Sequence, residues 1–105
     1  MDVDRPRYDT EEVERLARLG LVVATKRVAT WLMNHDYDAG TVLVEVLSSL
    51  GESGKWLGSC VLANFEIADE YAVDLEGEEW YVKFWLAGNC VVVNVWSCWW
   101  QGTAH

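Results

Sequence analysis

Basic residues are scarce in the last two thirds of this chain. From Asp36 onward the sequence holds eleven acids and only two lysines, Lys55 and Lys83, whereas residues 1–35 hold six acids and six bases. The whole formal charge of -9 therefore falls after position 35. Nucleic-acid sites normally cluster Lys and Arg, because these displace the counterions of the phosphates. The charge pattern therefore argues against an ordinary nucleic-acid-binding surface on this part of the chain.

The chain also lacks the usual patterns of disulfide frameworks, metal sites and membrane segments. Its three cysteines, Cys60, Cys90 and Cys98, form no CxxC pair, which predicts reduced thiols. The two histidines, His35 and His105, have no partner at a metal-ligand spacing, so we expect no metal and no cofactor. No apolar run reaches the roughly 18 residues of a membrane span, and the first residues do not resemble a secretory signal. We expect a cytoplasmic protein.

Helical signals fill the first half of the chain. Asp9 and Glu12 have the spacing of a capping box, and the apolar stripe that follows predicts a helix over 10–19. The apolar residues 21–23 then read as a connector.

Two further helices are predicted beyond this connector. Thr25 can cap a second helix, whose apolar stripe ends near His35. Asp38 precedes apolar residues at i, i+3, i+4 and i+7, which predict a third helix with Gly51 as its stop signal.

Strand signals fill the second half. Residues 52–59 read as a glycine-containing loop that leads into a strand over 60–67, and a second strand starts at about Tyr71. After a turn at 76–77, residues 80–86 alternate with a period of two, which predicts a strand with one core face.

Residues 87–89 then turn the chain into a last strand over 90–99, so the final pair should form an antiparallel hairpin. We therefore predict one α+β domain over 1–105, with three N-terminal helices packed on one side of a three- to four-stranded antiparallel sheet.

Tyr81 and Lys83 are the first candidates for chemistry. They lie two residues apart on the predicted strand, so both point away from the core, and Trp85 comes next on the same face. The charge of Lys83 would favour the tyrosinate, and both groups can donate to phosphoryl oxygens. This suits metal-independent RNA cleavage by the ribose 2'-hydroxyl. The same pattern is also typical of an ordinary amphipathic strand.

Tryptophan gives a second signal, since five of the seven lie in the last 26 residues. Most are expected to pack in the core or on the sheet. The adjacent pair Trp99 and Trp100 is followed by too short a tail to be covered, so an exposed pair would mark a binding surface.

Clustered acids give a third signal. They form either a solvated rim or a phosphate-like array that engages a basic groove on a partner. The acids concerned are Glu66, Asp69, Glu70, Asp74, Glu76, Glu78 and Glu79.

Four groups of residues, spread over most of the chain, resemble the motifs of a known family. They are Val13-Glu14-Arg15-Leu16 with Gly20, Thr25 and Ala29; Val46-Leu47-Ser48-Ser49-Leu50 with Glu52-Ser53; Asp69-Glu70-Tyr71; and Tyr81-Val82-Lys83-Phe84. Together they resemble the MqsR family of toxins from bacterial toxin-antitoxin systems, which is related in fold to RelE-type ribonucleases. The resemblance implies a small ribonuclease that cuts mRNA without metal and is held inactive by an antitoxin.

This chain departs from the family at working positions. Leu57 stands where the family has a lysine, with Lys55 displaced by two residues, and Ala68 stands where it has a glutamine. Tyr81 matches, with Lys83 nearby. These departures, and the acidic surface, imply reduced or absent catalysis.

Two main hypotheses follow. In the first, the protein is an mRNA-cleaving toxin with Tyr81, Lys83 and Lys55 as catalytic residues, and its partner is an antitoxin protein or RNA. In the second, it is a non-enzymatic acidic binding protein, such as a phage anti-defence or anti-CRISPR protein, which blocks the basic groove of a nucleic-acid-handling complex. A plain structural subunit is a third alternative.

Overall fold

The computed structural model describes residues 5–75 and 77–100, without the side chains of Ala39 and residues 95–100. In chain order its elements are α1 (Thr10–Arg18), β1 (Val22–Ala24), α2 (Lys26–Asn34), α3 (Ala39–Leu47), α4 (Leu50–Ser53), β2 (Gly54–Val61), β3 (Ile67–Leu75), β4 (Glu78–Ala87) and β5 (Cys90–Trp100).

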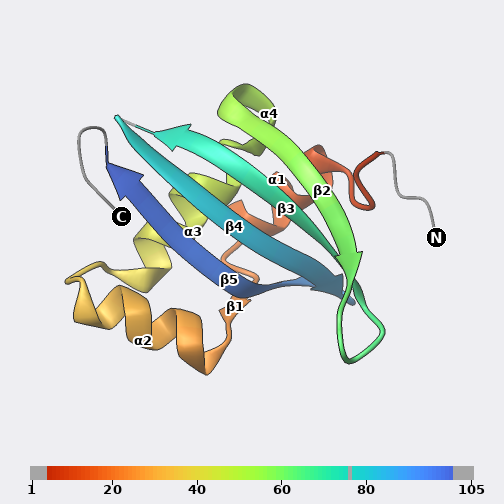
Figure 1. Ribbon diagram of the computed structural model, residues 1–105, viewed down its shortest axis with the longest axis horizontal. Helices are drawn as coiled ribbons and strands as arrows, with labels where there is room; N and C mark the ends of the chain where they lie inside the picture. Colours follow the sequence, from red (N-terminus) through yellow and green to blue (C-terminus); the bar gives the residue numbers. More distant parts are fainter. Residues whose placement is uncertain (1–4, 76, 101–105) are drawn as a thin grey trace.

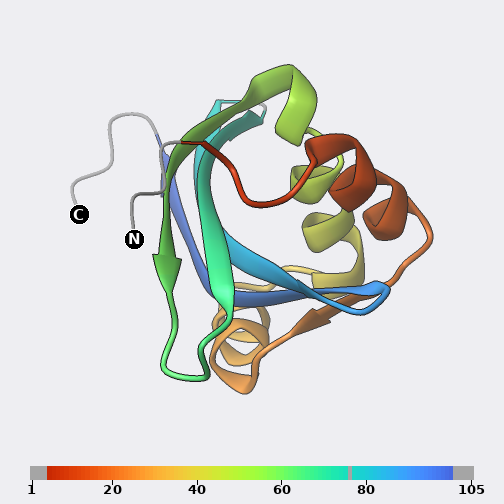
Figure 2. The ribbon, with the colours of Figure 1, turned by 90° about the vertical axis from the view of Figure 1, so that its right-hand side faces the viewer.

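The strands form one five-stranded sheet in the order β1-β5-β4-β3-β2 (Figure 1). β1 runs parallel to β5, and the other neighbours are antiparallel. The helices lie against one face of the sheet, and among residues 5–75 and 77–100 no helix covers the opposite face, which is called the open face below (Figure 2). The α+β class is confirmed, but the sheet is larger than predicted and mixed rather than wholly antiparallel.

The short strand β1 explains this difference. It overlaps the segment 21–23 that was predicted to be a connector, and it lies between α1 and α2, so the helices do not all precede the strands. Two backbone bonds flank its pairing with β5, from Val91 N to Leu21 O at 2.9 Å and from Thr25 N to Val93 O at 3.0 Å. Three apolar residues are too short a run to show a period, so only the pairing partner identifies them as a strand.

The caps of the helices follow the sequence signals in part. Asp9 accepts a hydrogen bond from Glu11 N at 3.0 Å, and Asp38 accepts one from Gly40 N at 3.1 Å. Glu12 pairs with Arg15 at 2.5 Å. The predicted third helix is divided, because α3 ends at Leu47 and the single turn α4 follows.

The predicted boundaries of the first antiparallel strands were wrong. β2 begins at Gly54 inside the predicted loop, and the predicted strand over 60–67 spans the end of β2, the β2–β3 loop and the first residue of β3. A Cβ at Gly54 would overlap the carbonyl oxygen of Leu50. Glycine therefore allows the chain to pass directly from α4 into β2, whereas the glycines of this segment had predicted a loop.

The core lies between the helices and the covered face of the sheet. The predicted alternation on β4 is confirmed, since Trp80, Val82 and Phe84 are buried. Across this layer pack the buried side chains of the helices and of the other strands, among them Val13, Leu16, Val28, Leu32, Leu43, Val46, Leu47, Leu50, Tyr71, Val73, Val91 and Val93.

Candidate functional site

The open face of the sheet carries the three residues that were predicted to be catalytic. Lys55 on β2 pairs with Ala72 on β3, and Ala72 pairs with Tyr81 on β4. Their Cα atoms therefore form a row across three strands, with Lys55 and Tyr81 roughly 10 Å apart. Lys83 lies on the same face, roughly 7 Å along β4 from Tyr81. The fold thus brings together side chains that are far apart in sequence.

A small hollow lies within this row. Its volume is about 100 Å3, and its lining residues are Ser53, Lys55, Ala72, Asp74 and Glu79. The small side chain of Ala72 leaves room between the longer side chains on either strand. The hollow therefore combines one ammonium with two carboxylates.

Tyr81 is held by a neighbouring carboxylate. Its hydroxyl donates to Glu79 Oε1. This hydrogen bond is the main cause that raises the pKa of Tyr81 above its usual value of 10.0, followed by desolvation and by the charges of Glu79 and Asp74. Lys83 was predicted to favour the tyrosinate, but the pKa of Tyr81 moves in the opposite direction. At neutral pH the phenol keeps its proton and can act as a proton donor.

Lys83 faces a carboxylate across the sheet. Its register partner on β3 is Glu70, and both side chains are partly buried on the open face. Opposite charges in directly paired positions stabilise a sheet. The positive groups on this face are therefore interleaved with Glu70, Asp74 and Glu79.

Asp69 does not belong to the acidic surface. Its side chain is fully buried and accepts hydrogen bonds from Arg7 N at 2.9 Å, Tyr8 N at 2.9 Å and Ser59 Oγ at 2.5 Å. Tyr8 also donates its hydroxyl to Ile67 O at 2.7 Å. Asp69 therefore holds the segment before α1 against β3, and it is not available to a partner.

The other predicted acids are divided among different places. Glu70, Asp74 and Glu79 share the open face, while Glu78 accepts a hydrogen bond from Tyr37 Oη at 3.0 Å. Glu66 is exposed in the β2–β3 loop, roughly 27 Å along β3 from Asp74. Glu76 lies outside the described residues.

The predicted tryptophan pair falls in β5. The backbones of Trp99 and Trp100 pair with Glu79 and Glu78. Their side chains lie outside the described residues, so an exposed binding pair stays a prediction.

Two further residues at this face have no signal in the sequence. Asn94 on β5 and Asn64 in the β2–β3 loop line a second hollow, together with Trp85. Asn94 is the extra residue of a β-bulge, because Lys83 pairs with Val95 while Phe84 pairs with Val93. No sequence pattern announces this bulge, and only the register between β4 and β5 reveals it.

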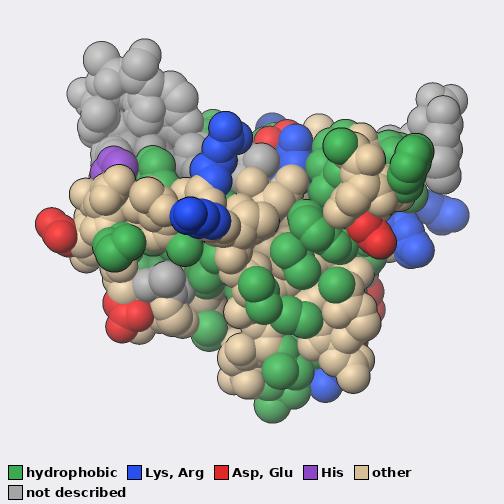
Figure 3. Space-filling model, turned by 90° about the horizontal axis from the view of Figure 1, so that it is seen from below, with side chains coloured by type: hydrophobic (Ala, Val, Ile, Leu, Met, Phe, Trp, Pro, Cys, Tyr) green, Lys and Arg blue, Asp and Glu red, His purple; other side chains and the backbone are tan. Residues whose placement is uncertain are grey.

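The large hydrophobic side chains with the highest exposure lie on several elements of the described chain. Seen from below, hydrophobic side chains gather mainly over the middle and right of the molecule, and most charged side chains lie around them (Figure 3). The examples with the largest exposure divide between the two outer strands of the sheet, their neighbouring loops and α2: Leu19, Leu21, Val23, Met33, Leu57, Val61 and Phe65. Scattered exposure of this kind is usual on protein surfaces.

Among the described residues, those that could bind metal or form disulfides do not form a site. Within residues 5–75 and 77–100, no group of three His, Cys, Asp or Glu side chains could hold a metal ion. Cys60 and Cys90 are free thiols, and His35 stacks on Trp31 with ring centroids 4.0 Å apart. In the same part of the chain, no helix combines the length and apolar character needed to cross a membrane.

Neither a family model nor a curated protein matches this chain. The resemblance to the MqsR family therefore rests on the four groups of residues given above.

Proposed function

We propose that this chain is a metal-independent endoribonuclease of the toxin type that binds RNA on the open face of its sheet. The observation that carries the proposal is the shared position of Tyr81, Lys83 and Lys55 on that face, with the Tyr81 hydroxyl held in its protonated form. A phenol and two ammonium groups suit phosphoryl transfer, because they supply a proton and positive charge without a metal ion.

In the proposed reaction the ribose 2'-oxygen attacks the adjacent phosphorus. Glu79 takes the proton of the 2'-hydroxyl, the bond from the 2'-oxygen to phosphorus forms, and the bond from phosphorus to the 5'-oxygen breaks. Tyr81 donates its proton to the leaving 5'-oxygen, and the two lysines stabilise the charge on the phosphorane. The products are a 2',3'-cyclic phosphate and a 5'-hydroxyl.

The residue at the bulge in β2 explains why we expect slow RNA cleavage. Trp56 pairs with Tyr71 and Gly58 with Glu70, so Leu57 is the extra residue, and its side chain is 44% exposed. Leu57 stands where the resemblance places a lysine. An aliphatic side chain there cannot stabilise the negative charge of the phosphorane. In the proposed reaction Lys55 and Lys83 therefore provide this stabilisation.

Alanine substitutions test the roles of the two lysines. Lys55→Ala and Lys83→Ala should each lower cleavage of a mixed-sequence RNA in EDTA by at least tenfold, which is about 1.4 kcal/mol of transition-state stabilisation. Lys26→Ala is the matched control, because Lys26 is exposed at the start of α2 and does not belong to the sheet. Wild-type rates in both open-face variants would contradict the proposal.

A second function is favoured by the carboxylates on the same face. Glu70, Asp74 and Glu79 lie around the lysines, and the whole chain carries a formal charge of -9. We propose as the alternative an acidic binding protein that occupies a basic groove on a nucleic-acid-handling complex. Such an interface gains much of its association rate from complementary charge.

Charge reversal distinguishes this alternative from a ribonuclease. Replacing Glu70 and Asp74 by Lys should weaken binding to a basic groove and should strengthen binding to RNA. Glu79 is left unchanged because it holds Tyr81. Affinity for the basic partner should also fall steeply with salt, and an affinity indifferent to both changes would exclude the alternative.

A further inference from the structure

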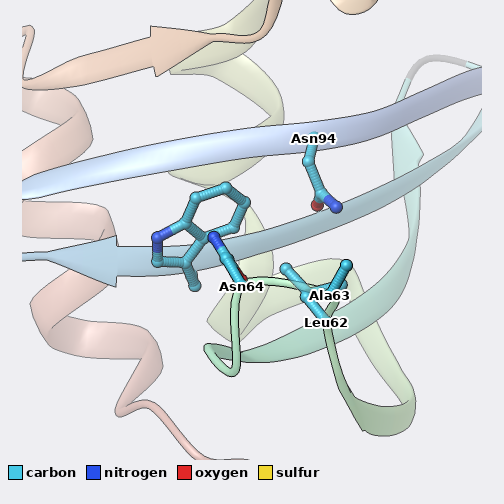
Figure 4. Close-up of a pocket in the computed structure, with 5 residues that line it drawn as sticks. Leu62, Ala63, Asn64 and Asn94 are labelled. Atoms are coloured by element: carbon cyan, nitrogen blue, oxygen red, sulfur yellow. The ribbon is translucent and has the colours of Figure 1, made fainter.

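The second hollow on the open face lies at the end of the sheet away from the β3–β4 turn. It has a volume of about 410 Å3 and is lined by Leu62, Ala63, Asn64, Trp85 and Asn94. Figure 4 shows Asn94 on β5 and the other labelled residues on the β2–β3 loop. The volume falls within the usual range of small-molecule sites, and the lining combines an indole with two amides.

The bulge in β5 places Asn94 in the lining of this hollow. Asn94 is the extra residue between Val93 and Val95, and bulges commonly re-aim a side chain near a site. Its Oδ1 atom is buried and has no hydrogen-bond partner among the described residues. A buried acceptor without a partner is unfavourable, so a ligand N–H group that reaches it would gain binding free energy.

The β2–β3 loop supplies a donor. Asn64 Oδ1 accepts a hydrogen bond from Glu66 N at 3.1 Å, which leaves the amide nitrogen of Asn64 to donate elsewhere. The loop is closed by bonds from Leu62 N to Glu66 O at 2.8 Å and from Phe65 N to Leu62 O at 2.9 Å. This wall of the hollow is therefore formed before any ligand arrives, which reduces the entropy cost of binding.

We propose that this hollow is a nucleobase subsite for the RNA that the open face binds, an inference that deepens the proposed ribonuclease function and rests on it. The base stacks on Trp85, its exocyclic amino group donates to Asn94, and a ring nitrogen accepts from Asn64. Protein amides recognise base edges in this way, and single-stranded bases stack on aromatic side chains.

The position along β4 connects the subsite to the candidate catalytic residues. Trp85 lies two residues beyond Lys83 and four beyond Tyr81 on the same strand face, which is roughly 7 Å and 14 Å. A base seated on Trp85 therefore leaves a neighbouring phosphate within reach of these groups. Stacking and neutral amide bonds need no positive charge, so the subsite suits a face that carries several carboxylates.

Binding of free nucleosides tests the subsite apart from catalysis, because nucleosides have no phosphate. The protein labelled with 15N is titrated with adenosine, cytidine and uridine while its amide and indole NMR signals are recorded. Adenosine and cytidine should shift the Trp85 and Asn94 signals and bind more tightly than uridine, which lacks an amino group. Ribose alone is the control ligand and should leave these signals in place.

Three variants sharpen the test. Trp85→Ala should weaken adenosine binding at least about fivefold, whereas Trp85→Phe keeps an aromatic face and should retain most of it. Asn94→Leu should weaken adenosine binding and remove its advantage over uridine. Tyr81→Phe should bind adenosine like the wild type and should cleave RNA poorly.

The outcomes separate this inference from the proposed function. An unchanged spectrum with all three nucleosides, equal shifts from ribose and adenosine, or wild-type adenosine binding by folded Asn94→Leu would overturn the subsite, even if RNA is cleaved. Nucleoside binding that depends on Trp85 and Asn94, in a protein that does not cut RNA, would support the subsite and remove the ribonuclease.

Discussion

Tyr81 donates its hydroxyl hydrogen to Glu79, which precedes it by two residues on the same face of β4. The two-residue period of the strand places both side chains on the open face of the sheet. This pair favours the neutral phenol, because the carboxylate accepts its hydrogen bond and raises the pKa of Tyr81.

Removal of this carboxylate charge should lower the pKa of Tyr81. Spectrophotometric titration near 295 nm, with the curve of Tyr81→Phe subtracted, isolates this tyrosine from the other three. In Glu79→Gln its titration should move to lower pH than in the wild type. Glu78→Gln is the matched control, since Glu78 accepts from Tyr37. A Tyr81 titration that is the same in Glu79→Gln and the wild type would contradict this account.

Asp69 should be important for stability rather than for binding. Asp69→Ala removes the acceptor of two backbone N–H groups and of the Ser59 hydroxyl, so unfolding free energy should fall by about 2–4 kcal/mol. The amide protons of Arg7 and Tyr8 should also exchange faster with solvent. Asp74→Ala, at an exposed position of the same strand, should change stability by less than about 0.5 kcal/mol. Equal effects of the two changes in chemical denaturation would refute this role.

Tyr71 should make the protein sensitive to alkaline pH. Desolvation in the core, helped by the charges of Asp69 and Asp9, raises the pKa of Tyr71 to about 12. The unfolded chain releases the Tyr71 proton near pH 10. The contribution of protonated Tyr71 to the free energy of unfolding is therefore complete below pH 10 and is lost as pH rises toward 12.

Tyr71→Phe should therefore reduce the decline of unfolding free energy between pH 10 and 12 by up to about 1.4 kcal/mol per pH unit. Urea unfolding at several pH values measures this slope. Tyr8 and Tyr81 also have a raised pKa, so part of the slope should remain. The idea fails if the slope of Tyr71→Phe equals that of the wild type.

Gly54 should tolerate no side chain. A Cβ there would overlap Leu50 O and lie 2.9 Å from Leu50 Cα, so Gly54→Ala should destabilise the protein by more than about 2 kcal/mol. Gly51→Ala is the control in the same turn, because its Cβ would meet the flexible Glu14 side chain at 3.3 Å. Thermal unfolding of both variants checks this prediction, and similar melting temperatures would contradict it.

Local signals gave the helices and the last hairpin, because each is defined within a short stretch. The caps at Asp9 and Asp38 are hydrogen bonds between residues close in sequence. The alternation of buried residues around Val82 is likewise visible within one strand. β1 could not be found in this way, because its partner Val91 lies far along the chain. The start of β2 could not be found from local signals either. Its glycines are typical of a loop, and only the close approach of Gly54 to Leu50 explains why glycine stands there.

The sequence predicts only those parts of the candidate site whose residues lie on a single strand. Tyr81 and Lys83 follow from the period of β4, but the approach of Lys55 needs the register of three strands. The raised pKa of Tyr81 depends on the rotamer of Glu79, which no spacing rule gives. The burial of Asp69 depends on a segment about sixty residues earlier, so charge counting placed this residue on the surface.

The most direct test of the central claim is cleavage of a labelled mixed-sequence RNA at low salt with EDTA, by the wild type and by Tyr81→Phe. This change removes the phenolic proton and leaves the ring, so it isolates proton donation from packing. We predict slow cleavage by the wild type to products with 2',3'-cyclic phosphate ends, and at least a tenfold lower rate for Tyr81→Phe. Equal rates, or no cleavage by the wild type, would contradict the ribonuclease assignment.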